Sequence, residues 1–300
     1  MVRWMIKIGV KLEPLVDLLH RHLLEGPICQ IDETTVQVLK EKGRLPTAKS
    51  YMIVQARGDP SGKAAVVFHY NPSRSKAVMK ERILGYEGIL LSDGLEVYNS
   101  LCTDMPKIVH AGCWSHVRRK FVDAQKSRKP SKRKKSLAYE FLLLIDRLFK
   151  IERKAKDLSD EDRLDRRKKE SKPLIEDIDR LIDEKISSVP KTSPIGKALH
   201  YTSNQWPKLT KFLGDAKIPI HNNFTENMIR PFTVGRKNWL FSTSVEGAKA
   251  SAVLYSLLVT AKVNGLNPYE YLCRALTEIS QPNPIENLAA LLPFVEKTDN

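Results

Sequence analysis

The sequence predicts an α/β fold in which helices flank a mixed sheet, and three observations carry this prediction. Residues 1–26 hold leucine and isoleucine at helical spacing, which indicates a helix. Residues 34–70 instead contain stretches of alternating apolar and polar residues, which are typical of strands. A short, continuous apolar run at 89–91 suits a strand that is buried on both faces.

Short strands and one helix follow one another in a simple order. We expect strand, strand, strand, helix and strand at residues 34–39, 51–55, 65–70, after Pro72, and at 88–93. This order is found in the front half of a ribonuclease H-like fold, whose first and fourth strands lie side by side and would place Asp32 next to Asp93. A fifth short strand is expected at 107–110, with a helix behind it at 116–125.

The composition changes at residue 126. The segment KSRKPSKRKK holds seven basic residues in ten, and a charge-dense stretch follows it. Apolar residues in this stretch recur every three or four positions, so two helices are expected to pack as a hairpin. The repeat is interrupted at 157–172 and at Pro173, which argues against a continuous coiled coil. The apolar positions are Leu142, Ile145, Leu148, Ile151, Ile175, Ile178, Ile182 and Ile186.

Helices are also expected near the C-terminal end. Asn222 and Asn223 are suitable N-caps for a short helix that carries Glu226 and ends at Pro231. An apolar helix at 248–263 should stop at the following Asn-Gly pair, and a final helix is expected at 284–292.

The predicted elements define a domain order. We expect an N-terminal helical segment, a first part of the catalytic core, a helical insertion, a second part of the core, and a C-terminal helix and tail, at residues 1–27, 28–126, 127–200, 201–280 and 281–300.

The chain is strongly basic. Lys and Arg total 50 against 35 Asp and Glu, which gives a net charge of +15 and a pI near 9.6. This excess favours a polyanionic partner, although a merely soluble basic protein is the alternative. No apolar run approaches the roughly 20 residues that span a bilayer, and no signal peptide is evident. Four irregularly spaced cysteines favour a reducing cytoplasm over a disulfide framework.

Three acidic residues are the candidate catalytic groups: Asp32, Asp93 and Glu226. Two divalent ions can activate an oxygen nucleophile and stabilise the leaving oxygen of a phosphodiester. Mg²⁺, with Mn²⁺ as a substitute, prefers a few carboxylates and the substrate phosphate as ligands. The alternatives are a turn role for Asp93, because Asp-Gly is a common turn pair, and a surface pair of Glu226 with Arg230.

His110, Cys113 and His116 form the pattern H-x-x-C-x-x-H. A structural zinc site normally has four ligands, and no fourth is evident nearby, so Zn²⁺ is not expected in this chain. A buried polar cluster that supports the active site is the favoured interpretation.

Basic residues lie next to both groups of candidates. Arg118, Arg119 and Lys120 follow the His/Cys cluster, and Arg230, Arg236 and Lys237 follow Glu226. Such residues are suited to phosphate contacts that position DNA without reading its sequence. The KSRKPSKRKK segment is either a similar contact or an exposed loop. Stacking on an unpaired base is one role for Trp239 and Phe241, but a core role is favoured for both.

Several short motifs occur in order along the chain: DET at 32–34, SDG at 92–94 with Tyr98, HAGCWSHVRRKF at 110–121, NN at 222–223 with Glu226, RP at 230–231 and GRKNWLF at 235–241. Together these blocks resemble the DDE transposases of the insertion sequence 66 group, from Ile31 to Phe294. The resemblance implies a ribonuclease H-like core with Asp32, Asp93 and Glu226 as the metal-binding triad, interrupted by a helical insertion.

The resemblance also implies an activity and partners. The chain would cut at transposon ends and join 3′-hydroxyls to target DNA, as a homo-oligomer assembled on DNA and with element-encoded accessory proteins as further partners. Its place would be the bacterial cytoplasm, at the nucleoid, with no membrane association. Cys113 and His116 match a C-x-x-H signature that supports the site in several such transposases.

The sequence departs from the family pattern at three positions, where it has Gln30, His221 and Asn227. None of these replaces a triad carboxylate. Full-length members carry a zinc-binding segment and a helix-turn-helix upstream, so specific recognition of transposon ends is expected to be missing here. One alternative is a truncated, catalytically incompetent remnant that binds DNA or a full-length partner, and another is a nuclease that hydrolyses but never joins.

Overall fold

The computed structural model describes residues 2–59, 61–281 and 285–294 and divides into two compact units. Unit 1 comprises the described residues of 1–88, 103–108 and 223–300. Unit 2 comprises residues 89–102 and 109–222. Each unit therefore combines segments that are far apart in the sequence.

The strands form one mixed sheet of six strands in the order β3-β2-β1-β4-β5, with β6 paired to β1 off this path. β1, β2 and β3 form an antiparallel meander, and β6 runs parallel to β1. The order predicted for the first four strands is confirmed. The strands are β1 (Ile28–Lys40), β2 (Lys49–Arg57), β3 (Ala65–Asn71), β4 (Gly88–Ser92), β5 (Ile108–Gly112) and β6 (Ser242–Ser244). β1 begins six residues before the predicted strand, so Asp32 lies inside it, opposite Val54 of β2.

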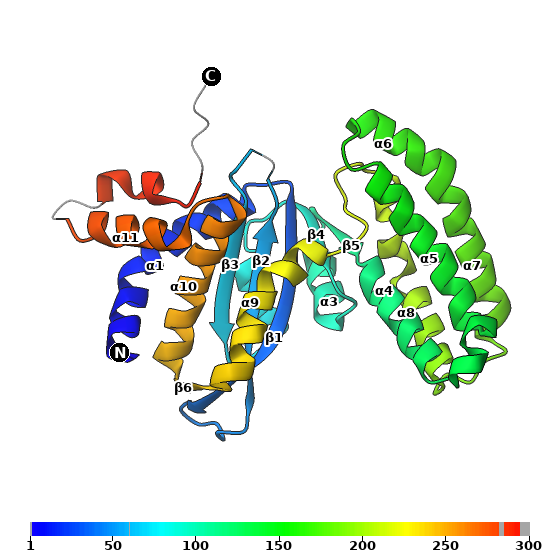
Figure 1. The fold of residues 1–300 in the computed structure, drawn as a ribbon, viewed down its shortest axis with the longest axis horizontal. Helices are drawn as coiled ribbons and strands as arrows, with labels where there is room; N and C mark the ends of the chain where they lie inside the picture. The colour runs from blue at the N-terminus through cyan, green and yellow to red at the C-terminus, as the bar shows by residue number, and fades with distance from the viewer. Residues whose placement is uncertain (1, 60, 282–284, 295–300) are drawn as a thin grey trace. The chain divides into compact units, whose positions relative to one another are not determined.

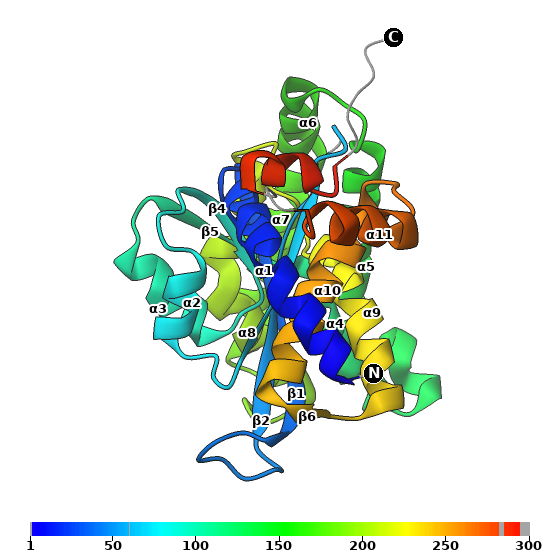
Figure 2. The ribbon, with the colours of Figure 1, turned by 90° about the vertical axis from the view of Figure 1, so that its left-hand side faces the viewer.

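Unit 1 contains the helices α1 (Val2–Leu24), α2 (Lys76–Arg82), α9 (Asn223–Trp239), α10 (Val245–Val263) and α11 (Pro268–Glu278). Of these, α1, α9 and α10 contact the β1–β3 meander, and α11 contacts α10. α1 and α10 contact each other and β3. Figures 1 and 2 both show α1 beside α10. Their close approach depends on Gly9, because a Cβ there would lie 2.7 Å from the Ala250 Cα. The predicted helices at 1–26 and 248–263 are thus confirmed.

Polar side chains of α10 bind the free edge of β3. The Ser256, Thr260 and Asn264 side chains accept hydrogen bonds from the backbone N–H groups of Phe68, Val66 and Ala64 at 2.8, 3.0 and 2.9 Å. The Thr260 and Asn264 side chains also donate to the carbonyls of Val66 and Ala64 at 3.0 and 2.9 Å, whereas the Ser256 hydroxyl donates to the Ala252 carbonyl of its own helix at 2.8 Å. Four helical residues rise about 6 Å and two strand residues about 6.6 Å, so the two spacings match over the two steps that separate the three contacts. We call this set the edge ladder.

α9 is longer than the sequence predicts, because it does not end at Pro231. The proline lacks the N–H that would bond to Asn227, which costs about 3 kcal/mol in a helix interior. The helix continues because its later turns bury apolar surface: Phe232 is completely buried and packs against Phe68 and Trp239 in the core of unit 1.

Unit 2 contains a bundle of long helices. They are α4 (Trp114–Lys126), α5 (Leu137–Lys154), α7 (Lys172–Ile186) and α8 (Pro194–Leu209), which contact one another in the cycle α4–α5–α7–α8 (Figure 1). The shorter α3 (Glu96–Asp104) and α6 (Asp160–Arg166) complete the set. The predicted apolar positions of α5 and α7 are buried from Leu142 to Ile182, whereas Ile186 is only half-buried. The predicted helical hairpin is confirmed.

The apolar repeat breaks over 157–172, but the chain is helical over most of this range. Only residues 155–159 separate α5 from α6, and the helix then continues from Asp160 through a π-helical segment, Arg167–Ser171, into α7. A π turn holds one residue more than an α turn. The extra room lets Pro173 follow without breaking the helix.

Arg167 in the π segment is completely buried and uses all five of its N–H donors. Nε and Nη2 donate to the two carboxylate oxygens of Glu152 at 2.8 and 2.7 Å. The other N–H groups donate to the carbonyls of Phe212, Asp215 and Ile218 at 2.6, 2.8 and 3.0 Å. We call this arrangement the arginine clamp, and it fixes the segment 212–218 against the bundle.

The C-terminal helices differ from the prediction. α11 was not predicted, because only Tyr271 and Ala275 are buried in it and its apolar pattern is sparse. In place of the helix predicted at 284–292, a 3-10 helix spans Ile285–Leu291, and Pro284 lies outside the described residues. In the described ranges no helix is both long and apolar enough to cross a bilayer.

Candidate active site

Asp32 lies in the middle of β1 and is half-buried. Its Oδ1 accepts a hydrogen bond from the Glu33 N–H at 2.9 Å. Successive side chains of a strand point to opposite faces, so Gln30, Asp32 and Thr34 share one face of β1.

α9 lies along that face of β1. The Thr225 hydroxyl donates to Gln30 Oε1 at 3.3 Å, and Arg236 Nη1 donates to Thr34 Oγ1 at 2.8 Å. Eleven helical residues span about 16 Å and four strand residues about 13 Å, so helix and strand run side by side in the same direction. Asp32 lies between these two contacts and therefore faces α9.

Glu226 follows Thr225 and occupies the first turn of α9. Unbonded N–H groups at the start of a helix favour a negative charge there. The contact between Thr225 and Gln30 places this turn at the end of α9 that lies beside Gln30, two residues from Asp32. Unit 1 thus brings together the segments that carry two of the three predicted acids.

Asp93 belongs to unit 2, where it follows β4 directly. Its Oδ1 accepts a hydrogen bond from the Leu95 N–H at 2.9 Å, which is the turn role that its sequence allows. The next position requires glycine, because a Cβ on Gly94 would lie 2.6 Å from the Tyr201 ring. The carboxylate therefore has one oxygen committed to the turn.

Two residues near Asp93 were not predicted from the sequence, and both lie on α8. Burial raises the pKa of the Tyr201 phenol, and the negative charge of Asp93 raises it further. Burial lowers the pKa of Lys208, whose Nζ donates to Asn99 Oδ1 at 2.6 Å. The two side chains are seven residues apart, which places them on one face of a helix. No local pattern relates them to Asp93.

Two residues of the H-x-x-C-x-x-H pattern, His110 and Cys113, have separate partners in unit 2. His110 Nε2 lies 2.8 Å from the Ser92 hydroxyl, and burial lowers the pKa of this histidine to about 4. The Asn222 N–H donates to Cys113 Sγ at 3.2 Å, and the neighbouring Trp114 N–H donates to the Ile220 carbonyl at 3.0 Å. Cys113 therefore fixes the segment that leads into α9.

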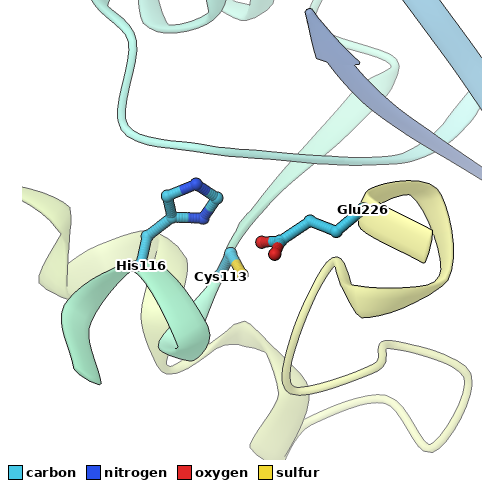
Figure 3. Close-up of side chains that lie close together, drawn as sticks. All are labelled: Cys113, His116 and Glu226. Carbon is cyan, nitrogen blue, oxygen red and sulfur yellow. The ribbon is translucent and has the colours of Figure 1, made fainter. Parts of the chain in front are cut away.

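The close-up in Figure 3 identifies the elements that carry three of the candidates. Cys113 lies where β5 ends and α4 begins, and His116 lies in the first turn of α4. Glu226 extends from the first turn of α9, in unit 1. Each of the three side chains thus comes from the beginning of a helix.

Several of the basic residues predicted to contact DNA make contacts within the protein. Arg118 pairs with Asp146 of α5 at 2.7 Å, and Lys120 Nζ lies 5.1 Å from the centroid of the Tyr201 ring. Arg236 donates to Thr34 and to the Thr35 carbonyl. The other predicted contacts are Arg119, Arg230 and Lys237, of which the last two are exposed on α9.

The two aromatic residues after the basic pair differ from each other. Trp239 packs edge-on against Phe232 at 5.3 Å between ring centroids, so the predicted core role is confirmed for it. The same prediction is wrong for Phe241, which is 40% exposed. The residue between them, Leu240, has a positive φ of 65° and is also exposed, because the chain reverses there between α9 and β6.

Comparisons with known proteins are consistent along the whole chain. Residues 1–250 match the family described as Transposase IS66 family, and residues 256–294 match the IS66 C-terminal element. Among curated proteins of Sinorhizobium fredii (strain NBRC 101917 / NGR234), uncharacterized protein y4qI is 30% identical over 100% of this chain and 56% of its own length. Uncharacterized protein y4jD is 32% identical over 99% of this chain and 59% of its own length. The chain thus spans just over half the length of these curated relatives.

Proposed function

Because the chain belongs to the IS66 family of transposases, we propose that it is a catalytic region that cuts DNA at transposon ends and joins the 3′-hydroxyl ends to target DNA. We also propose that its sheet and flanking helices form a ribonuclease H-like core. The strand order supports this assignment, since it is the order expected of that fold.

Asp32, Asp93 and Glu226 are the proposed ligands of a divalent metal, Mg²⁺ or Mn²⁺. Carboxylate oxygens suit these ions, and Asp93 keeps one oxygen outside its turn hydrogen bond. When bound, such ions activate the attacking oxygen and stabilise charge on the leaving oxygen. The observation that carries the proposal lies in unit 1: α9 runs along β1, so that Asp32 faces the helix whose first turn holds Glu226.

The neighbouring residues have proposed supporting roles. His110 orients the Ser92 hydroxyl beside Asp93, and Cys113 holds the segment before α9 through Asn222, while His116 completes this polar group. The Tyr201 phenol is protonated at neutral pH, as any tyrosine is, and its raised pKa widens that margin, so it is proposed as a hydrogen-bond donor near Asp93.

DNA is the proposed substrate, and the net charge of +15 supports it. Arg230 and Lys237 are exposed and suited to phosphate contacts. Four further basic residues already have partners within the protein: Arg118, Arg119, Lys120 and Arg236. Each is proposed to contact DNA only if it can do so while keeping that partner or after releasing it. Assembly as a homo-oligomer on DNA, a need for accessory proteins, and a place in the cytoplasm at the nucleoid follow from the same proposal.

The test is strand joining with purified protein, a duplex that ends in a 3′-hydroxyl, a plasmid target and Mn²⁺. Asp93→Asn and Glu226→Gln should each abolish the joined product while leaving the thermal midpoint and most DNA affinity unchanged. The matched control is Glu246→Gln, because Glu246 also lies in the first turn of a helix of unit 1.

Joining at the wild-type rate by Asp93→Asn would disprove the triad. Cleavage without joined product would indicate a nuclease. Salt-sensitive DNA binding with no metal-dependent chemistry at all would instead indicate an inactive remnant.

A further inference from the structure

The basic segment between α4 and α5 is a folded loop, which we call the basic loop (residues 126–135). Pro130–Lys135 forms a 3-10 helix with proline in its first turn. The Arg133 guanidinium donates back to the carbonyls of Arg128 and Lys126 at 3.2 and 3.4 Å. The Ser136 hydroxyl donates to the Arg133 carbonyl at 2.6 Å and accepts a bond from the Tyr139 N–H, which caps α5.

The helices on either side anchor this loop. Phe121 of α4 stacks on Phe141 of α5, with ring centroids 4.4 Å apart. One turn earlier on α4, Arg118 pairs with Asp146. The basic loop is therefore held at the closed end of a packed helix pair, and binding a ligand there would cost little ordering of the backbone.

The charge of the basic loop is exposed and uncompensated. Six of its seven basic residues are exposed, and Arg133 alone is half-buried. The sequence has no acidic residue between Ala124 and Tyr139. Within residues 2–59, 61–281 and 285–294, the ion pairs involve none of the six exposed ones, which are Lys126, Arg128, Lys129, Lys132, Lys134 and Lys135.

This loop contrasts with the basic residues that the motifs single out. Arg118, Lys120 and Arg236 are occupied by Asp146, by the Tyr201 ring and by Thr34. The basic loop lies outside every motif and holds six exposed cations that make no ion pair with the described residues.

We propose that the basic loop binds the sugar-phosphate backbone of duplex DNA, independently of base sequence. This rests on the proposed function only in taking DNA as the substrate. A six-residue 3-10 helix is about 12 Å long. That length corresponds to about three to four phosphates of one strand along the duplex axis, at about 3.4 Å each. Flexible lysines suit such contacts, because they act as point charges and do not read base edges.

The test measures DNA affinity against salt in the absence of divalent ions, by fluorescence anisotropy with two unrelated 30-base-pair duplexes. The loop variant combines Lys132→Gln, Lys134→Gln and Lys135→Gln. The control combines Lys168→Gln, Lys169→Gln and Lys172→Gln, which removes the same charge from exposed positions of unit 2. Two of these three control lysines face acidic partners, at Asp165 and Glu176.

Each lost phosphate contact should lower the slope of log affinity against log salt by about 0.9. Three lost contacts lower the slope by about 2.7. When NaCl is raised fourfold, the factor by which affinity falls should therefore be about 40 times smaller for the loop variant than for the wild type. The loss should be the same for both duplexes, and the control should keep the wild-type slope.

Equal slopes for the loop variant and the control would overturn the proposal. So would tighter binding of the basic loop to poly-glutamate than to duplex DNA, which would assign it to an acidic protein segment. The DNA-binding measurement contains no divalent ion and does not depend on catalysis. Failure of the wild type to join strands would therefore disprove the proposed catalysis, and the salt dependence would still decide the proposal for the basic loop.

Discussion

The two units satisfy buried backbone groups with different chemistry. In unit 1 the edge ladder uses neutral side chains, and each of Ser256, Thr260 and Asn264 serves one strand residue. In unit 2 the arginine clamp uses one charged residue, and Arg167 serves three carbonyls and a buried carboxylate at once. A distributed set of neutral bonds can lose one member and keep the others. Loss of the Arg167 guanidinium instead removes all of its hydrogen bonds together and leaves Glu152 charged and without its main partner.

The largest effect is therefore expected for Arg167→Met. Removing one partner of a buried ion pair costs about 3 to 5 kcal/mol, because the other charge stays buried. The free energy of unfolding of unit 2 should fall by this amount in urea titrations. Adding Glu152→Leu should recover most of the loss, since the carboxylate is then removed too. No recovery in the double variant would show that the clamp acts mainly through the three carbonyls.

Acid should weaken both units. Burial lowers the pKa of His20 to about 4 and of His69 to about 3 in unit 1, and of His110 to about 4 in unit 2. These histidines are neutral when folded, so the unfolded chain binds more protons between about pH 4 and 6.5 and stability falls as pH falls through that range.

Unit 2 has a further acid-sensitive group. Burial raises the pKa of Glu152, but its hydrogen bonds to Arg167 and Arg163 outweigh burial and lower the pKa overall. Its stabilisation is present above the unfolded pKa and is lost as pH falls through the lowered value. Hydrogen exchange of each unit at pH 7, 5.5 and 4 would separate the two contributions. Unchanged protection of β3 between pH 7 and 5 would contradict the prediction for His69.

An intermediate effect is expected for Thr260→Val, which keeps the shape and removes the hydroxyl. The Val66 N–H and carbonyl then lose their partner, at a cost of about 2 kcal/mol. Amide exchange at Val66 should accelerate, while Phe68 and Ala64 keep their protection through Ser256 and Asn264. Thr233→Val on α9 is the control, because its hydroxyl bonds only to the Arg230 carbonyl of its own helix. Loss of protection at all three strand residues would mean that the edge ladder is cooperative.

The smallest effect is expected for Leu240→Gly, and it should be stabilising. A positive φ costs a residue with a side chain about 1 to 2 kcal/mol, and the greater unfolded entropy of glycine offsets about half of this. The midpoint of thermal unfolding should rise slightly. Leu240→Ala is the control, since it keeps the strain and removes only the exposed side chain; an equal rise for it would show that backbone strain is not the cause.

Local patterns in the sequence account for most of the elements. Alternation, β-rich composition and a continuous apolar run located β1 to β4, and the apolar composition of 248–263 located α10. Helical spacing located α1, α5 and α7, because in these helices one face is buried and the other is not. Pro231 does not end α9, because the burial of Phe232 offsets the local cost of the proline. Pro173 does not break its helix either, because the wider π turn precedes it. Such compensation arises from tertiary packing and leaves no local signal.

The candidate site was only partly predictable for the same reason. Motifs identified Asp32, Asp93 and Glu226, and strand periodicity explains why Asp32 faces α9. Tyr201 and Lys208 come near Asp93 across more than a hundred residues of chain, which no spacing rule detects. Arg167 is one of several arginines in a charge-dense segment, and no pattern in the sequence distinguishes it as the buried one. The sites of the metal and of DNA stay predictions.

The edge ladder also limits how copies of this protein can associate. A free strand edge is a template on which another chain can add a strand, and proteins avoid aggregation by covering such edges. On β3 the backbone groups of Ala64, Val66 and Phe68 are already bonded to α10. Another copy of this protein therefore cannot add a strand to the sheet at these three residues.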